Sequence, residues 1–212
     1  MKNKKVIVFD LDGVLLDSVD LMLSLNRGAF PGITDKQTRD FYRGNIYEES
    51  SKSNLPKVDE TEEEKQKRWD AYNKIKLNVS LHKGIKELLS KLSKKYILTI
   101  NTSSWDVTTL PILELNDVKK QFSFIATSNI TMNKIEKFKT IAHKFKMKPM
   151  ELLFITDTLG DVKEAGLLSI PTIVVTWGMH GRKYFDEKAY KNIVGFVNTV
   201  EELENYIVSS FK

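Results

Sequence analysis

The feature that most constrains the fold is an alternation of short, apolar, β-branched runs with segments that carry apolar side chains at helical spacing. The runs are residues 6–9, 97–100, 122–126, 152–155 and 172–175. The helical stripes include Ile85, Leu88, Leu89 and Leu92, then Ile135, Phe138, Ile141, Ala142 and Phe145, then Val200, Leu203 and Ile207. Uninterrupted apolar runs are typical of strands buried on both faces, and strands that alternate with helices form parallel sheets. The sequence therefore predicts an α/β fold with a doubly wound parallel sheet.

Residues 17–81 break this alternation, because they contain no strand-like run. We expect helices over residues 18–30, 35–43 and 61–77. Pro31-Gly32 should stop the first helix, and Thr61 with Glu64 has the spacing of a capping box. We therefore expect a small all-helical domain at 17–81, inserted into a core made of residues 1–16 and 82–212.

Composition excludes several classes of protein. The chain has no cysteine, so disulfides, thiolate metal sites and a cysteine nucleophile are ruled out. Its net charge is +5, with Lys and Glu interleaved, which is typical of a solvated surface rather than a nucleic-acid tail. No apolar stretch is long enough to span a membrane, and the apolar run that Asp10 ends is too short for a signal peptide. We expect a cytoplasmic protein.

Acidic residues follow two of the predicted strands. Asp10 and Asp12 come directly after the first strand, in a loop opened by Gly13. Asp157 and Asp161 follow the strand at 152–155 and lie one helical turn apart. The carboxyl ends of parallel strands form the ligand crevice of such sheets, and carboxylates there can bind a hard cation. Helix capping is the competing interpretation. It is the preferred one for Asp17 or Ser18, and for Asp157 or Thr158 it can coexist with metal binding.

Hydroxyl, amide and amine groups also lie at the ends of predicted strands or the starts of predicted helices. Asn101, Thr102, Ser103 and Ser104 come after the strand at 97–100, where capping of a helix beginning near Asp106 would explain Ser104. Lys134 precedes the apolar stripe that starts at Ile135 and stands off its apolar face. Lys137 and Lys139 are alternative candidates for a lysine of the site.

These motifs resemble those of the haloacid dehalogenase-like hydrolases. Phe9-Asp10-Leu11-Asp12-Gly13-Val14 is similar to the family's first motif, and the later motifs follow in the family's order, through the core segment 170–178. The family commonly has Gly where Thr156 stands. The resemblance implies a Rossmann-like core with an inserted helical cap, in the branch of phosphoglycolate phosphatase-like enzymes.

The resemblance also implies roles for individual residues. Asp10 would be the nucleophile and Asp12 the acid–base, which favours a phosphoryl-transfer member over a dehalogenase. Thr102, or Asn101 or Ser103 if the register differs, would hold phosphoryl oxygens together with Lys134. Gly13 and Ser103 would contact the substrate. The implied cofactor is Mg²⁺, held by Asp10, the backbone carbonyl of Asp12, Asp157, and Asp161 through water.

The expected function is a magnesium-dependent phosphatase that hydrolyses a small phosphorylated metabolite through an aspartyl-phosphate. A phosphomutase would share the motifs. A phosphatase acting on nucleic-acid ends would need a basic groove with stacking aromatics, and no such stripe is visible. A non-catalytic binding protein is disfavoured because all the expected acids are present. Arg43, Tyr47 and Lys52 are candidates for substrate contact in the insertion, and Trp105 and His180 near the strand ends; ordinary surface or packing roles are the alternative.

Overall fold

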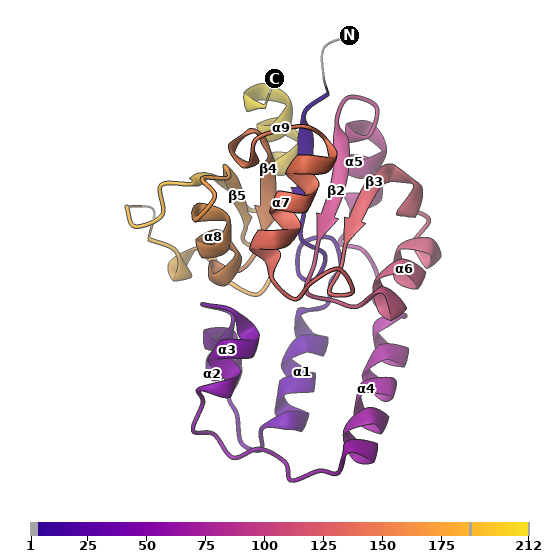
Figure 1. Cartoon of the computed structure of the whole chain (residues 1–212), viewed down its shortest axis with the longest axis vertical. Coiled ribbons are helices and arrows are strands. Elements are labelled where there is room, and N and C mark those ends of the chain that lie inside the picture. Colours follow the sequence, from indigo (N-terminus) through magenta and orange to yellow (C-terminus); the bar gives the residue numbers. More distant parts are fainter. Residues whose placement is uncertain (1–3, 187, 212) are drawn as a thin grey trace.

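The computed structural model describes residues 4–186 and 188–211, which form one six-stranded parallel sheet with helices on both faces (Figure 1). The strand order is β3-β2-β1-β4-β5-β6. The strands are β1 Val6–Phe9, β2 Ile97–Asn101, β3 Phe122–Ala126, β4 Leu153–Thr156, β5 Thr172–Val175 and β6 Ile193–Val197. β1 pairs in parallel with both β2 and β4, so the chain winds outward in two directions from the centre. This confirms the predicted doubly wound α/β fold.

The strand at the edge, β6, was not anticipated from the sequence. Its run is interrupted by Gly195, and most of its residues are only partly buried. The central strands β1, β4 and β5 are buried along their whole length. The other edge strand, β3, is also only partly buried, but its run contains no glycine and was predicted, whereas Gly195 interrupts the run of β6.

Two apolar layers cover the sheet, and alternate residues of β1 point into opposite layers. Ile7 and Phe9 pack in one layer with α5 and α9, whereas Val6 and Val8 pack in the other with α7. The helices of this core are α5 Ile85–Leu92, α6 Asp106–Leu115, α7 Lys134–Lys144, α8 Leu159–Gly166 and α9 Val200–Ser210, with short 3₁₀ turns at Lys119–Gln121, Pro149–Glu151 and Arg182–Tyr184.

Four helices lie between β1 and α5, gathered beyond the carboxyl ends of the strands (Figure 1). They are α1 Val19–Ala29, α2 Asp35–Phe41, α3 Ile46–Ser51 and α4 Glu62–Lys76. The short α3 was not expected. The capping box of α4 is complete, since the backbone N–H of Glu64 donates to the Thr61 hydroxyl and the Thr61 N–H donates to the Glu64 carboxylate. We call these four helices and their connections, residues 17–81, the helical insertion.

The two connections of the helical insertion run side by side. The Asp17 N–H donates to the Ser80 carbonyl at 3.0 Å, and the His82 N–H donates to the Leu15 carbonyl at 2.9 Å. An antiparallel bridge joins Leu16 and Leu81 between them. The insertion therefore leaves and rejoins the core at one place.

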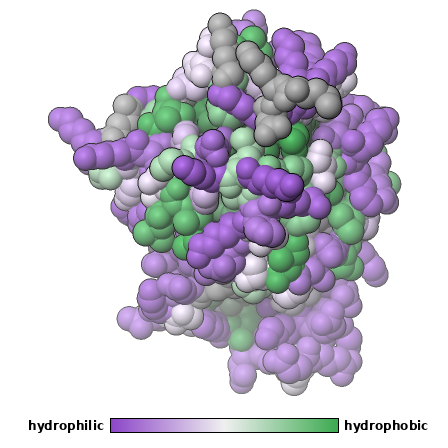
Figure 2. All heavy atoms as spheres, turned by 45° about the horizontal axis from the view of Figure 1, so that its top comes forward, coloured by the Kyte–Doolittle hydropathy of each residue, from purple (hydrophilic) through white to green (hydrophobic). Residues whose placement is uncertain are grey.

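Most of the visible surface of the insertion is hydrophilic, including the region of α4 at the lower right of Figure 2, with a green apolar patch between its two lobes. In residues 4–186 and 188–211, no helix combines the length and apolar character needed to cross a membrane.

Candidate active site

Asp10 lies at the carboxyl end of the central strand, where the sheet holds it in place. Its N–H donates to the Ile155 carbonyl at 2.9 Å, and its Oδ1 accepts from the Leu11 N–H at 2.8 Å. Its Oδ2 lies 3.0 Å from Nζ of Lys134, the first residue of α7. Burial raises the pKa of Asp10 well above its usual value, although Lys134 opposes the shift. The carboxyl group is therefore desolvated and lies next to one cation.

Asp161, in the first turn of α8, shares that cation. Its Oδ2 lies 2.7 Å from Lys134 Nζ and accepts a hydrogen bond of 2.7 Å from the Thr156 hydroxyl. Burial disfavours the charged form, but Lys134 and these hydrogen bonds lower the pKa of Asp161. Burial also disfavours the charged ammonium of Lys134, yet Asp10 and Asp161 raise its pKa above the ordinary value. Thr156 thus orients an acid, a role its sequence position did not predict.

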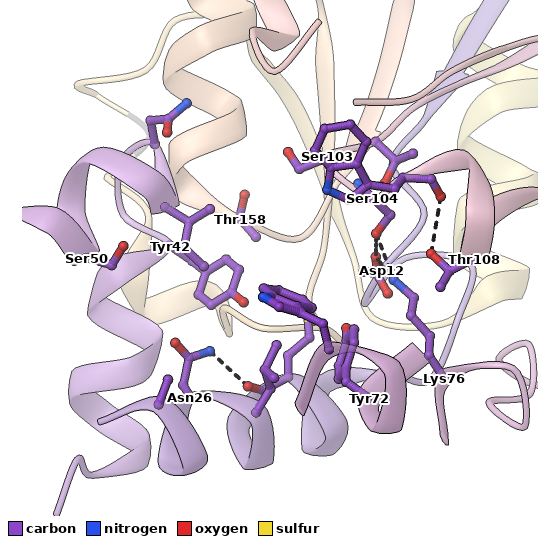
Figure 3. A pocket seen from close by; sticks show the side chains of 18 of the residues that line it. Asp12, Asn26, Tyr42, Ser50, Tyr72, Lys76, Ser103, Ser104, Thr108 and Thr158 are labelled. Carbon is purple, nitrogen blue, oxygen red and sulfur yellow. Dashed lines mark hydrogen bonds and ion pairs between the residues drawn. The ribbon is translucent and has the colours of Figure 1, made fainter. Parts of the chain in front are cut away.

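Asp12 accepts hydrogen bonds on both oxygens. The Ser18 hydroxyl donates to Oδ1 at 2.9 Å, while the Ser104 hydroxyl and Lys76 Nζ each lie 2.7 Å from Oδ2 (Figure 3). Burial alone would raise the pKa of Asp12, but Lys76 and the hydroxyls outweigh it and lower the pKa. Ser18 is the N-cap residue of α1, as expected, but the capping role expected of its hydroxyl and of the Ser104 hydroxyl was wrong. Neither side chain caps a helix, because both bind Asp12 instead.

Lys76 is the site residue that sequence reasoning missed. It ends α4 of the helical insertion, its side chain is only 1% exposed, and it crosses to the core to reach Asp12 and Ser104. The available signal was its spacing from Trp69 and Tyr72, which places the three side chains on one face of α4. Nothing local marks that face as the one that meets the core.

Asp157 has the donor chemistry that a hard cation requires. Its Oδ2 accepts from the Met179 N–H at 2.6 Å, but its buried Oδ1 has no hydrogen-bond partner. Burial raises the pKa of Asp157 to about 7. A Cβ at Gly13 or Gly178 would come within 2.1 or 2.2 Å of Asp157 Oδ2, so both glycines are needed for its placement. Gly13 also has a φ of +75°, which favours glycine.

Within residues 4–186 and 188–211, no three acidic or histidine side chains surround a common point as metal ligands do. Lys134 instead lies between Asp10 and Asp161. The carboxyl groups of Asp157 and Asp10 nevertheless fit a divalent cation. Both offer oxygen donors, and a bound cation would offset the cost of burying an unpartnered oxygen on Asp157 and a negative charge on Asp10.

The polar cluster after β2 divides between two sides of the strand end. Thr102 and Ser103 face a cavity, whereas the Asn101 amide donates to the Lys134 carbonyl at 3.1 Å. Buried Lys137 donates to the Thr102 carbonyl at 2.6 Å, and burial lowers its pKa to about 8. Lys139 is exposed and pairs with a neighbouring glutamate. The geometry therefore brings Thr102, Ser103 and Lys134 to the cavity and leaves Lys137 behind them.

The cavity has a volume of about 640 Å³ and lies between the core and the helical insertion (Figure 3). Its floor is lined by the polar residues Asp10, Asp12, Thr102, Ser103, Lys134 and Asp161. Trp69, Tyr72 and Trp105 are among its other lining residues.

Some residues expected to contact the substrate do not line this cavity. Gly13 is not part of the lining, and its N–H donates to the Leu16 carbonyl and the Ser18 hydroxyl. Arg43 and Lys52 do not line this cavity either, and both form ion pairs with acids of the insertion. The side chain of Tyr47 lies outside the described part.

The insertion docks on the core beside the acids. The Gly160 N–H donates to the Tyr42 carbonyl at 2.9 Å. His180 is fully buried, its Nδ1 accepting from the Leu159 N–H at 2.9 Å and its Nε2 lying 2.8 Å from the Arg39 carbonyl. Because Leu159 requires an unprotonated Nδ1, the proton of the neutral ring is on Nε2 and donates to Arg39. Burial lowers the pKa of His180 to about 4.

An all-parallel sheet with a desolvated carboxylate, a buried lysine and further acids at its carboxyl edge is typical of α/β enzymes whose chemistry takes place at the strand ends. The sequence model of the haloacid dehalogenase-like hydrolases matches residues 7–175. The chain belongs to this family. Curated relatives matched over part of the chain are the tyrosine-protein kinases PtkA of Mycobacterium tuberculosis and Mycobacterium bovis, 30% identical over 128 residues. That alignment covers 58% of this chain and 44% of theirs, so it spans less than half their length.

Solved structures share the whole architecture. A haloacid dehalogenase-like family protein from Streptococcus pneumoniae superposes with a TM-score of 0.78 at 21% identity, covering 98% of this chain and 100% of that one. A predicted phosphoglycolate phosphatase from Haemophilus somnus gives 0.69 at 22% identity, covering 97% and 99%. CbbY from Rhodobacter sphaeroides, solved in complex with phosphate, gives 0.71 at 14% identity, covering 94% and 96%. These similarities establish the fold.

Proposed function

We propose that this protein is a magnesium-dependent phosphatase that hydrolyses a small phosphate monoester through an aspartyl-phosphate on Asp10. The observation that carries the proposal is the position of Asp10, a desolvated carboxylate that reaches the cavity floor beside Lys134. Phosphoryl transfer requires an aligned nucleophile and neutralised oxygens. Family membership and the phosphatase names of several structural neighbours support the same reaction class.

In the first step, an Oδ of Asp10 attacks phosphorus, and the bond to the leaving oxygen breaks as that oxygen takes a proton from Asp12. In the second step, Asp12 takes a proton from water, which attacks the aspartyl-phosphate and releases phosphate. Thr102, Ser103 and Lys134 would hold the phosphoryl oxygens. Because Lys76 lowers the pKa of Asp12, the contact seen here stabilises the base form used in the second step.

Asp10, the backbone carbonyl of Asp12 and Asp157 would hold the magnesium ion, with Asp161 acting through water. When bound, the ion neutralises charge on the phosphoryl oxygens, so that one anion can attack another. Asp157 has the buried oxygen without a partner, and Asp10 has the carboxylate whose charge burial disfavours. The positive charge of the cation would stabilise both buried carboxylates.

The helical insertion, residues 17–81, would act as a cap that sets substrate choice. Its two connections lie together, and it contributes Lys76 and one side of the cavity wall. The core groups contact the phosphoryl group common to all monoesters. The insertion contacts the leaving group, and that is where monoesters differ.

The test combines metal removal with variants of an acid. Hydrolysis of para-nitrophenyl phosphate should require Mg²⁺ and stop with excess chelator. Asp10→Asn should abolish both turnover and the phosphoenzyme trapped by acid quench. Asp17→Asn, a change at an exposed acid, should leave both intact. Equal rates with and without chelator would overturn the metal role, and phosphoenzyme in Asp10→Asn would overturn the nucleophile.

A second candidate is phosphoryl transfer to an acceptor other than water. The similarity to relatives named tyrosine-protein kinases favours it, because those names describe transfer to a hydroxyl group. Adding acceptor alcohols during turnover and measuring phosphorylated alcohol against free phosphate separates the two reactions. Release of phosphate alone would support the hydrolase.

A further inference from the structure

We infer that the leaving group of the natural substrate carries a flat aromatic ring and no second negative charge. This inference rests on the proposed phosphatase function and concerns the same cavity. It differs from a phosphoglycolate-type substrate, whose leaving group carries a carboxylate.

Aromatic side chains from both sides surround the cavity. Trp69 and Tyr72 come from α4, Phe30 and Tyr42 from the C-caps of α1 and α2, and Trp105 from the N-cap of α6 in the core. The Trp69 side chain is 38% exposed and the Trp105 side chain 47% exposed. Exposed aromatics scattered singly over a surface need no explanation, but these two line one cavity that is continuous with the active site. A bound ring would cover both indoles.

The spacing of residues along one face of α4 sets the distance from Asp12 to the aromatic rings of Tyr72 and Trp69. Lys76 contacts Asp12, the proposed acid for the leaving oxygen, and its Nζ lies 5.9 Å from the centre of the Tyr72 ring. Trp69 packs edge-on against Tyr72, with ring centres 5.6 Å apart. At about 1.5 Å per residue, Tyr72 lies about 6 Å and Trp69 about 10 Å back along the helix from Lys76. A ring separated from phosphorus by a short linker, or by none, would therefore meet this aromatic wall.

The charges around the cavity disfavour a second anion on the leaving group. Each Lys or Arg side chain among the described lining residues already lies close to a carboxylate. Lys76 pairs with Asp12, Arg68 with Glu60 at 2.7 Å, Lys65 with Glu62 at 3.5 Å, and Lys134 with Asp10 and Asp161. A carboxylate or second phosphate on the leaving group would compete with these acids for the cations. It would also face the carboxyl group of Glu164, which lines the same cavity.

The test compares aromatic and aliphatic monophosphates on the wild-type chain and on matched variants. Uridine monophosphate, pyridoxal phosphate and phenyl phosphate represent three sources of an aromatic leaving group, and ribose phosphate and phosphoglycolate are the aliphatic references. We expect kcat/KM at least about tenfold higher for one aromatic class, because stacking on one side chain contributes about 1–3 kcal/mol. Trp69→Ala should lower kcat/KM for that class by about 10- to 100-fold and change the ribose phosphate value less than threefold. The control is Ile75→Ala on the same helix, which is exposed and outside the lining and should change neither value.

Equal kcat/KM for aromatic and aliphatic substrates in the wild type would overturn the inference. So would a Trp69→Ala variant that loses both activities equally, or a preference for phosphoglycolate. If the chain hydrolyses no member of the panel, the proposed function fails, and the inference is decided by binding alone. Quenching of tryptophan fluorescence in Asp10→Asn should then report tighter binding of aromatic than aliphatic monophosphates, with the difference lost in Trp69→Ala. Equal binding would overturn it.

Discussion

Gly160→Ala tests whether the docked position of the helical insertion is the active one. Gly160 lies between Asp157 and Asp161, in the first turn of α8. A Cβ at this position would lie 2.2 Å from the Gly44 carbonyl oxygen and 3.1 Å from that of Tyr42. Both neighbours are backbone atoms and cannot rotate away. The insertion would have to withdraw by about 1 Å to restore ordinary van der Waals contact.

The free-energy cost of this withdrawal has two parts. The hydrogen bond from the Gly160 N–H to the Tyr42 carbonyl, worth about 0.5–1.5 kcal/mol, weakens, and the overpacking adds about 1–3 kcal/mol. A displacement of about 1 Å near the chemistry can reduce the rate about 100-fold. We therefore expect kcat/KM of Gly160→Ala to fall by about two orders of magnitude. The free energy of unfolding should fall by less than the sum of these costs, by about 0.5–3.5 kcal/mol, because alanine favours the helix by about 1 kcal/mol over glycine.

Steady-state kinetics and thermal unfolding of Gly160→Ala and of a control variant test whether catalysis requires the docked position. The control is Gly28→Ala on α1, where an added Cβ meets nothing within 4 Å and activity should be unchanged. If Gly160→Ala stays within about threefold of Gly28→Ala, which is only about 0.6 kcal/mol, close docking at α8 is not needed for catalysis and the reasoning is refuted.

Two further predictions concern single side chains. Lys76→Met should raise the pKa of Asp12, so the acidic limb of the kcat profile should move to higher pH, and an unmoved limb would contradict the role given to Lys76. Because the pKa of His180 is about 4 in the folded chain against an ordinary 6.5, protons bind the unfolded chain first as pH falls below 6.5. The free energy of unfolding should therefore drop by about 2 kcal/mol more in the wild type than in His180→Gln between pH 7 and pH 5. Equal drops in denaturant titrations would show that His180 is not held neutral by its bond from Leu159.

The sequence predicted those parts of the site that depend on local order along a strand. Asp10, Lys134, Asp157 and Asp161 each stand at a strand end or helix start, and parallel strands bring such positions to one edge. Their catalytic and metal roles remain proposals, but their proximity follows from the fold. Thr156 was recognised as a departure from the family pattern, and only the structure shows that its hydroxyl holds Asp161.

The missed features depend on contacts between distant segments. Ser104 was interpreted as a cap because a hydroxyl before a helix usually is one, yet Asp12 takes its hydrogen bond. Lys76 looked like one of many lysines on a polar helix, since the docking that buries it joins residues 64 positions apart. The substrate candidates Arg43 and Lys52 were selected for charge. The cavity wall is built from aromatics instead, whose spacing on α4 is visible in the sequence but whose orientation is not.

The contact between Lys76 and Asp12 connects docking of the insertion with the charge of the proposed acid–base. When α4 lies against the core, the ammonium group reaches Asp12 and lowers its pKa, which favours the base that activates water. Loss of this cation would shift Asp12 toward its protonated form, which is the acid needed by the leaving group. A leaving group bound against Tyr72 and Trp69 occupies the same face of α4 as Lys76. Binding of the leaving group is therefore coupled to the ion pair that sets the charge of Asp12.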